Sequence, residues 1–146
     1  MFDVKIIESE KMEIIIPFLQ ILDPNLTTEE LKIRIPKMVT NNYSCVGVYE
    51  NEKLIGISGF WLIQKYYTGL YIEPDNVVID PKYRNNGIGE IISKWIDEYA
   101  TNIGCVASNL NVYTTNEKAI KFWINKGYKI ISFHLQKKYN KIETKL

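Results

Sequence analysis

The stretch IDPKYRNNGIGEII, residues 79 to 92, is the most informative part of this sequence. An apolar run ends at Ile79, then Arg84, Gly87 and Gly89 follow, and a helical pattern begins directly after them. The first backbone N–H groups of a helix have no acceptor inside it, and the helix dipole adds partial positive charge at the same end. Glycines let a bulky anion approach that backbone, and Arg84 adds a formal charge. The turn therefore predicts a bound phosphate or pyrophosphate.

Two well-known phosphate-binding turns fit this stretch poorly. A Walker loop needs Lys and then Ser or Thr after its second glycine, and here Glu90 follows Gly89. A dinucleotide fingerprint needs a third glycine three residues after Gly89, and position 92 is Ile. A nucleotide-binding protein and a plain helix start with flexible glycines both stay open as readings of the turn alone.

The helix after the turn is predicted over residues 87 to 103. Its apolar residues recur at steps of three and four, and Gly104 supplies a stop. These apolar residues are Ile88, Ile91, Ile92, Trp95, Ile96, Tyr99 and Ile103. The spacing predicts an amphipathic helix packed on a sheet.

The rest of the chain alternates between strand and helix patterns. Residues 2 to 7 suit a strand, and Thr27 with Glu30 has capping-box spacing before a helix. One helical face is expected to gather Met12, Ile15, Ile16, Leu19 and Leu22.

The later elements are expected to build a mixed sheet. Residues 43 to 50 and 54 to 63 read as an antiparallel hairpin, and a strand interrupted at Pro74 follows. Further strands at 105 to 113 and 128 to 139 flank a short helix over 115 to 126, ended by Gly127. The expected fold class is α/β in the broad α+β sense.

Length and composition limit the classes of protein to which this chain can belong. A chain of 146 residues with 46% apolar composition predicts a single domain over residues 1 to 146. A net charge of +1 gives no case for binding nucleic acid or an anionic membrane. Cys45 and Cys105 match no metal spacing, and the N-terminus does not resemble a signal peptide. We expect reduced, buried thiols, no metal and a cytoplasmic location.

Two motifs resemble the GNAT superfamily of N-acetyltransferases. The first is Arg84, two residues, Gly87, one residue and Gly89, preceded by an Ile-Asp-Pro element. The second is NEKAIKFWINKGY, residues 116 to 128, in which Asn116, Ala119, Phe122, Gly127 and Tyr128 match the family pattern. The motifs stand in the family's order with a strand between them, and the resemblance covers essentially the whole chain.

The resemblance implies a GNAT-like fold: a mostly antiparallel, strongly bent mixed sheet, flanked by helices and splayed to admit coenzyme A. The pantetheine arm would pair with backbone groups of Val77, Val78 and Ile79. The pyrophosphate would rest beside Arg84 on backbone amides. These amides belong to Asn85, Asn86, Gly87, Ile88, Gly89 and Glu90.

The resemblance also implies acetyl transfer from acetyl-CoA to an amine by direct attack. A backbone N–H near Val78 would hold the carbonyl oxygen. Glu73 and Asp75 are the candidate bases, because a spacing of two puts them on one face of a strand unless Pro74 distorts the register. Glu73 is the first choice, and two solvated acids near a strand end are the alternative.

The candidate acid departs from the family pattern. The family commonly has Tyr where this chain has Trp123, and an indole cannot protonate a thiolate at physiological pH. Trp123 is expected to pack against the pantetheine or the core, and Tyr113, another tyrosine or water would supply the proton. Asn116 is expected to cap its helix and contact the cofactor, and His134 to be a packed strand residue.

The sequence leaves the acceptor open. It is expected to be a small-molecule or peptide amine, and the aromatic residues at 60, 61, 66 and 67 are candidates to line its pocket. A non-catalytic coenzyme A-binding sensor or interaction module is the alternative function, motivated by Trp123. A homodimer paired through sheet edges is compatible with this sheet, and no residue decides it.

Overall fold

The structure is a computed structural model that describes residues 1 to 140. The chain divides into two compact units, Met1–Leu110 and Asn111–Leu146. A single domain over the whole chain stays a prediction.

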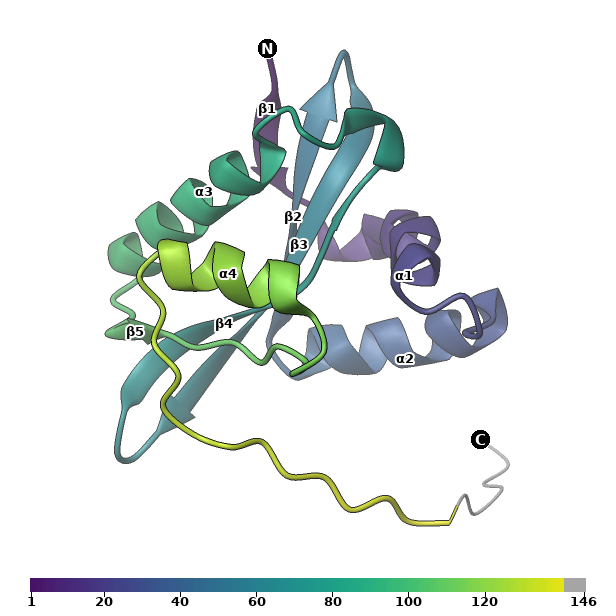
Figure 1. The fold of residues 1–146 in the computed structure, drawn as a ribbon. Coiled ribbons are helices and arrows are strands. Elements are labelled where there is room, and N and C mark those ends of the chain that lie inside the picture. The colour runs from purple at the N-terminus through teal and green to yellow at the C-terminus, as the bar shows by residue number, and fades with distance from the viewer. Residues whose placement is uncertain (141–146) are drawn as a thin grey trace. The chain divides into compact units, whose positions relative to one another are not determined.

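The first unit is built on a five-stranded mixed sheet in the order β1-β2-β3-β4-β5 (Figure 1). The first four strands pair antiparallel and β5 pairs parallel to β4. The strands are β1 (Asp3–Ile6), β2 (Tyr43–Glu50), β3 (Lys53–Lys65), β4 (Gly69–Ile79) and β5 (Ala107–Ser108). The predicted mixed, mostly antiparallel sheet is confirmed.

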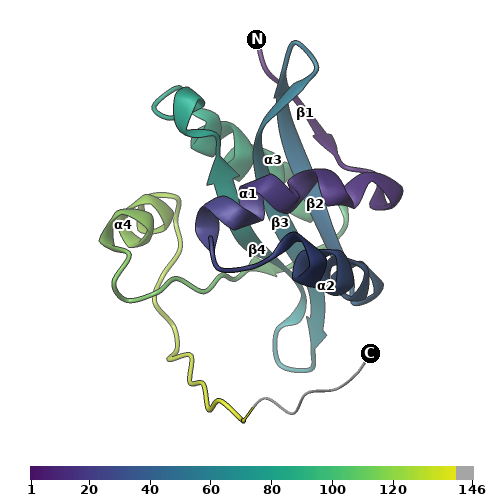
Figure 2. The same cartoon turned by 90° about the vertical axis from the view of Figure 1, so that its right-hand side faces the viewer.

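Helices cover both faces of this sheet. Figure 2 shows α1 and α2 in front of the strands and α3 behind them. The helical segments of the first unit are η1 (Ser9–Ile15), α1 (Ile16–Leu22), α2 (Thr28–Thr40), η2 (Pro81–Tyr83) and α3 (Ile88–Asn102). The two layers bury separate apolar clusters, which fixes the side of the sheet to which each strand residue points.

The cluster under α3 follows the predicted period. Ile88, Ile92 and Ile96 are at most 1% exposed, and they pack with Phe60 and Ile72 of the sheet. Each of these isoleucines removes enough apolar surface from water to contribute about 1.5–3 kcal/mol. The helix predicted over 87 to 103 is confirmed within one residue at each end.

The helices on the other face confirm one prediction and correct another. Thr27 and Glu30 form the predicted capping box, with Thr27 Oγ1 accepting from the Glu30 amide at 3.1 Å. The single apolar face ending at Leu22 is wrong, because Leu22 is 54% exposed. Residues 9 to 15 form a 3₁₀ helix with three residues per turn, so the apolar face that they begin does not continue in phase into α1.

The β3–β4 pairing contains an irregularity that matters for the site. Asp75 lies opposite Gly59, whereas Val78 lies opposite Ile57, so β4 carries one more residue than β3 across this interval. Such a bulge bends the strand and redirects its side chains. Pro74 itself stays in register opposite Phe60, so it does not cause the distortion.

Strand β5 is much shorter than predicted. The pattern over 105 to 113 suggests a long strand, but only Ala107 and Ser108 pair, with Tyr71 and Ile72. Beyond the bond from the Asn109 amide to the Ile72 carbonyl at 3.0 Å, no strand of residues 1 to 140 pairs with this edge of β4. Val77–Ile79 at the end of β4 thus have no partner from β5, and the predicted splay stays a prediction.

The second unit contains α4 (Glu117–Asn125), close to the helix predicted over 115 to 126. The strand predicted over 128 to 139 is wrong, because no described strand pairs with residues 129 to 140. An alternating pattern shows that a segment suits a sheet, but a strand also needs a partner backbone. His134 is consequently exposed and outside any strand, so the prediction of a packed strand histidine is wrong.

The bulge depends on the absence of a side chain at Gly59. A Cβ there would collide with the Tyr43 hydroxyl and the Asn76 side-chain oxygen. We expect Gly59→Ala to lower the free energy of unfolding by about 1–3 kcal/mol in urea denaturation, because the core cannot absorb the extra methyl.

Gly56→Ala is the matched control for this substitution. It adds the same methyl to the same strand, where the nearest atom, Ile88 Cγ2, lies at an ordinary 3.4 Å. Equal losses of stability in the two variants would contradict a specific contact over Gly59.

Candidate active site

The end of β4 presents an uncovered backbone edge. The Asp80 amide donates to the Ile55 carbonyl of β3 at 2.8 Å. In an antiparallel pair successive residues point their N–H groups to opposite sides, so the Val78 N–H faces β3 and the N–H groups of Val77 and Ile79 face the other edge. The predicted donor near Val78 stays a prediction, and the N–H groups that face away from β3 are those of Val77 and Ile79.

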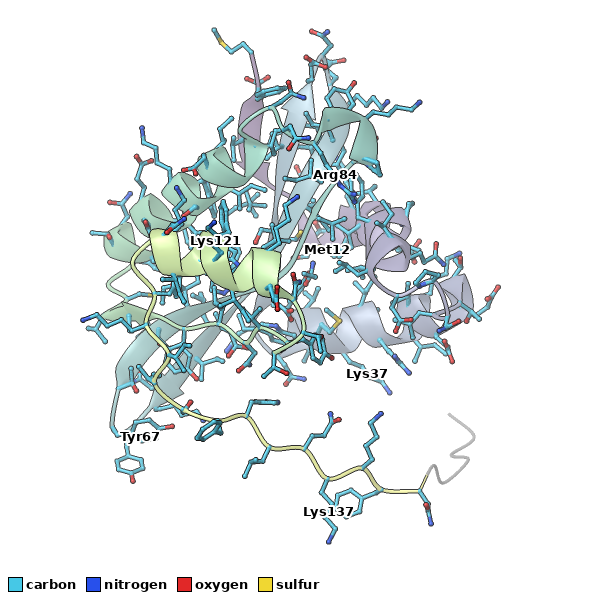
Figure 3. The ribbon with its side chains drawn as sticks, in the orientation of Figure 1. Met12, Lys37, Tyr67, Arg84, Lys121 and Lys137 are labelled. Atoms are coloured by element: carbon cyan, nitrogen blue, oxygen red, sulfur yellow. The ribbon has the colours of Figure 1, made fainter. Side chains whose placement is uncertain are left out.

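The loop after β4 folds Arg84 back toward this edge. Arg84 Nε donates to the Ile79 carbonyl at 3.4 Å, and Figure 3 labels Arg84 in the loop that precedes α3. Asp80 Oδ1 accepts from the Lys82 amide at 2.9 Å, which fixes the start of the loop. The guanidinium charge is therefore held beside the last residue of the strand.

Two left-handed residues turn the chain into α3. Asn85 has φ of 66° and Gly87 has φ of 76°. The Asn86 side-chain amide donates to the carbonyls of Tyr83 and Arg84 at 3.0 and 3.3 Å. The conformation of the turn thus rests on its own asparagine and glycine residues.

The N-terminus of α3 has no side-chain cap. Its first backbone bond runs from the Ile91 amide to the Gly87 carbonyl at 3.2 Å, so the amides of Ile88 and Gly89 have no acceptor within the helix. A Cβ placed on Gly87 would meet no protein atom within 4 Å. The backbone at Gly87 thus has free space on its outer side, and the bound anion stays a prediction.

The two candidate carboxylates lie on one face of the sheet, toward α1 and α2. Glu73 is opposite Trp61 and Asp75 is opposite Gly59 on the neighbouring strand. Glu73 is half-buried and Asp75 is exposed. Asp75 accepts two hydrogen bonds, from Trp61 Nε1 at 2.9 Å and from the Asn76 amide at 2.8 Å.

A partly buried hydrogen-bonded pair that the sequence analysis missed lies at the bulge. The Tyr43 hydroxyl donates to Asn76 Oδ1 at 2.9 Å, and Asn76 has φ of 36°. The Asn76 side-chain nitrogen is buried and has no hydrogen-bond partner among the described residues. An Asn in a strand is a weak sequence signal for a left-handed bulge, but nothing in the sequence pairs it with Tyr43.

Burial keeps the side chains of Tyr43 and Cys45 uncharged. Desolvation raises the pKa of Tyr43 well above its usual range, and the neighbouring Cys45 adds to the shift. Burial likewise raises the pKa of Cys45 to about 12. Cys45 is therefore a neutral, inert thiol at physiological pH, as predicted, while Cys105 is also free and only half-buried.

The remaining predicted residues belong to the second unit. Asn116 caps α4, with its side-chain oxygen accepting from the Ala119 amide at 3.2 Å, as expected. Trp123 is buried and packs edge-on against Phe122 and Tyr128. Tyr113 is 86% exposed. The first unit therefore carries Glu73, Asp75 and residues 77 to 79 on one strand, with Arg84 of the following loop beside Ile79. The roles of all these residues stay predictions.

The helical face of the first unit contains a cavity of about 280 Å³. It is lined by Ser9, Glu10, Met12, Glu13, Ile35, Pro36 and Val39. The aromatic residues predicted to line an acceptor pocket divide: Tyr66 and Tyr67 are exposed at the β3–β4 turn, whereas Phe60 is buried under α3. Only Trp61 lies on the face that carries the carboxylates.

Two classes of site are not found in the part of the chain that the structure describes. Residues 1 to 140 hold no cluster of three His, Cys, Asp or Glu side chains suited to a metal ion. No helix over the same residues is long and apolar enough to cross a membrane.

The sequence matches the model of a known protein family. The model of the acetyltransferase (GNAT) family matches residues 12 to 128, most of the chain and parts of both units. The chain belongs to the GNAT acetyltransferase family. The first GNAT motif accordingly corresponds to the open amides before α3.

Known GNAT proteins resemble the chain in sequence and in fold. The thialysine N-epsilon-acetyltransferase of Mus musculus is 30% identical over 77 residues, which are 53% of this chain and 45% of that protein. The chain thus spans about half the length of this relative.

Solved structures resemble the chain over nearly its whole length. Glucosamine-6-phosphate N-acetyltransferase from Arabidopsis thaliana has a TM-score of 0.72 and 18% identity, with 96% of this chain and 99% of that chain covered. Aminoglycoside N-acetyltransferase AAC(6')-Iy in complex with CoA has a TM-score of 0.80 and 12% identity, with 95% of each chain covered. At such identities the likeness establishes the GNAT fold.

Proposed function

We propose that this chain is an acetyl-CoA-dependent N-acetyltransferase that transfers the acetyl group to a primary amine by direct attack. The observation that carries the proposal is the uncovered edge of β4 leading to the uncapped, glycine-opened N-terminus of α3. The thialysine N-epsilon-acetyltransferase similarity supports an amine as the acceptor.

The residues present fit acetyl-CoA. The amides from Asn85 to Glu90 and the Arg84 side chain would hold the pyrophosphate, because a helix N-terminus with open backbone favours anions. The edge of Val77–Ile79 would pair with the pantetheine amides as an added strand would. When bound, acetyl-CoA supplies a thioester that reacts with a neutral amine.

Different groups of the chain would then carry out the different steps of the reaction. Backbone N–H groups of Val77 or Ile79 would stabilise the developing oxyanion, which is usually the largest electrostatic contribution to acyl transfer. Glu73 would take the proton from the acceptor ammonium. It is favoured over Asp75 because it is less exposed to solvent. Tyr113 or water would protonate the departing thiolate.

The proposed function is tested by thiol release. Acetyl-CoA is incubated with the protein and polyamines, aminoglycosides, amino acids including thialysine, or peptides, and free thiol is measured. We expect at least one primary amine to raise turnover well above background hydrolysis. If calorimetry shows that coenzyme A binds but no amine stimulates turnover, the result would instead favour the non-catalytic module. If ATP or NAD raises the melting temperature and acetyl-CoA does not, the result would favour a nucleotide-binding protein.

The phosphate-binding turn has a matched pair of glycines for its test. Gly87 and Gly104 both have left-handed φ, 76° and 88°, and an added Cβ meets nothing within 4 Å at either position. Alanine at each should cost about 1–2 kcal/mol of stability, because left-handed backbone disfavours a side chain. Only Gly87→Ala should weaken coenzyme A binding, by roughly tenfold or more in calorimetry. Unchanged affinity in Gly87→Ala would contradict the assigned turn.

The proposed base is tested by Glu73→Gln. We expect kcat/KM to fall about 10²–10⁴-fold at neutral pH, since a general base contributes that much. The deficit should shrink as pH rises toward the amine pKa of about 10, where solvent deprotonates the acceptor. Glu52→Gln, at the exposed β2–β3 turn, is the control. Full activity of Glu73→Gln would transfer the role to another group or to water.

A further inference from the structure

Trp61 and Asp75 form an aromatic–carboxylate pair on the sheet face that carries Glu73. The indole Nε1 of Trp61 donates to Asp75 Oδ2 at 2.9 Å, across neighbouring strands β3 and β4. Trp61 is half-buried and Asp75 is exposed, so the pair is accessible. Glu73 lies opposite Trp61 in the strand register, which puts a second carboxylate beside the same ring.

The pair is held rigidly by a closed circuit of contacts. Asp75 Oδ1 accepts from the Asn76 amide at 2.8 Å, and Asn76 Oδ1 accepts from the Tyr43 hydroxyl at 2.9 Å. The Tyr43 ring meets the Trp61 ring edge-on, with centroids 4.9 Å apart and planes at 62°. Indole and carboxylate are therefore oriented before any ligand arrives, which lowers the entropic cost of binding.

Among the residues that the structure describes, no cation is paired with the Asp75 carboxylate. Its two hydrogen-bond donors, Trp61 Nε1 and the Asn76 amide, are both neutral, and it forms no ion pair with any residue that the structure describes. An ammonium group is attracted both to a carboxylate and to the face of an indole ring. The pair thus has the chemistry of an alkylammonium site.

We propose that Trp61 and Asp75 receive the acceptor as a protonated primary alkylammonium group, next to Glu73, which then removes its proton. The inference rests on the proposed function and makes it specific. The acceptor is a cationic alkylamine, such as an amino-acid side chain or a diamine, and not an arylamine that is neutral at physiological pH. Trp61 and Asp75 are specificity-determining residues, and Tyr43 and Asn76 are positioning residues for them.

Binding is tested without turnover. The indole N–H signal of Trp61 is followed in proton–nitrogen correlation spectra of the full chain, assigned with Trp61→Phe, while pentylamine, cadaverine or thialysine is added. Pentanol is the neutral match of pentylamine. We expect a saturable shift of the Trp61 signal with the amines and none with pentanol, whereas the Trp95 signal stays in place.

The outcomes separate the site from the reaction. No saturable shift with any of the three amines up to tens of millimolar, or an undiminished shift in Asp75→Asn, would overturn the site. A shift without acetyl transfer would leave the site standing and refute the proposed function. Acetyl transfer without a shift of the Trp61 signal would support the proposed function and refute the binding site. The Trp61–Asp75 pair would then be only a structural contact between two strands.

Kinetics of variants provide the second measurement. Asp75→Asn and Trp61→Leu should raise KM for an alkylamine by about tenfold or more, with KM for acetyl-CoA unchanged. Trp61→Phe keeps a ring and should have a smaller effect. Asp97→Asn and Tyr67→Leu are the controls; Tyr67 lies at the far turn of the hairpin in Figure 3. A thermal melt verifies folding, and equal effects on both KM values would overturn the assignment.

Discussion

The Tyr43 hydroxyl and the Asn76 side-chain oxygen meet above Gly59, and the course of β4 depends on this contact. A side chain at position 59 would separate the two groups. With the glycine in place, Asn76 takes a left-handed conformation and β4 gains one residue relative to β3. The bulge bends β4 just before Val77–Ile79, the segment that has no partner from β5.

The same contact connects the two chemical tasks proposed for the site. On one side of the bulge the Asp75 carboxylate is fixed beside Trp61. On the other side, the backbone of Val77–Ile79 continues into the loop in which Arg84 contacts the Ile79 carbonyl. The residues proposed to bind the acceptor and those proposed to bind the acyl donor thus follow one another along one strand. A change in the register of that strand would therefore displace both sets of residues.

The sequence predicted those features that local physics controls. The isoleucine spacing of α3, the capping box at Thr27 and the open turn at Gly87 depend on residues close together in the chain, and the structure has each of them. The bulge at Asn76 depends on Tyr43 and Gly59, which come from two other strands, so no local pattern reveals it. The strand predicted over 128 to 139 was wrong because an alternating pattern does not show whether a partner strand lies beside the segment.

Helix α3 is positioned by its buried face rather than by its ends. Ile88, Ile92 and Ile96 repeat at every fourth position, and all three are at most 1% exposed. Sliding the helix by one residue would move it about 1.5 Å and rotate it about 100°, which would turn these side chains out of the core. The packing of isoleucines up to two turns away therefore fixes where the first amides of α3 lie along the helix axis. A cavity in that apolar layer would shift the position of these amides and of the anion proposed to bind them.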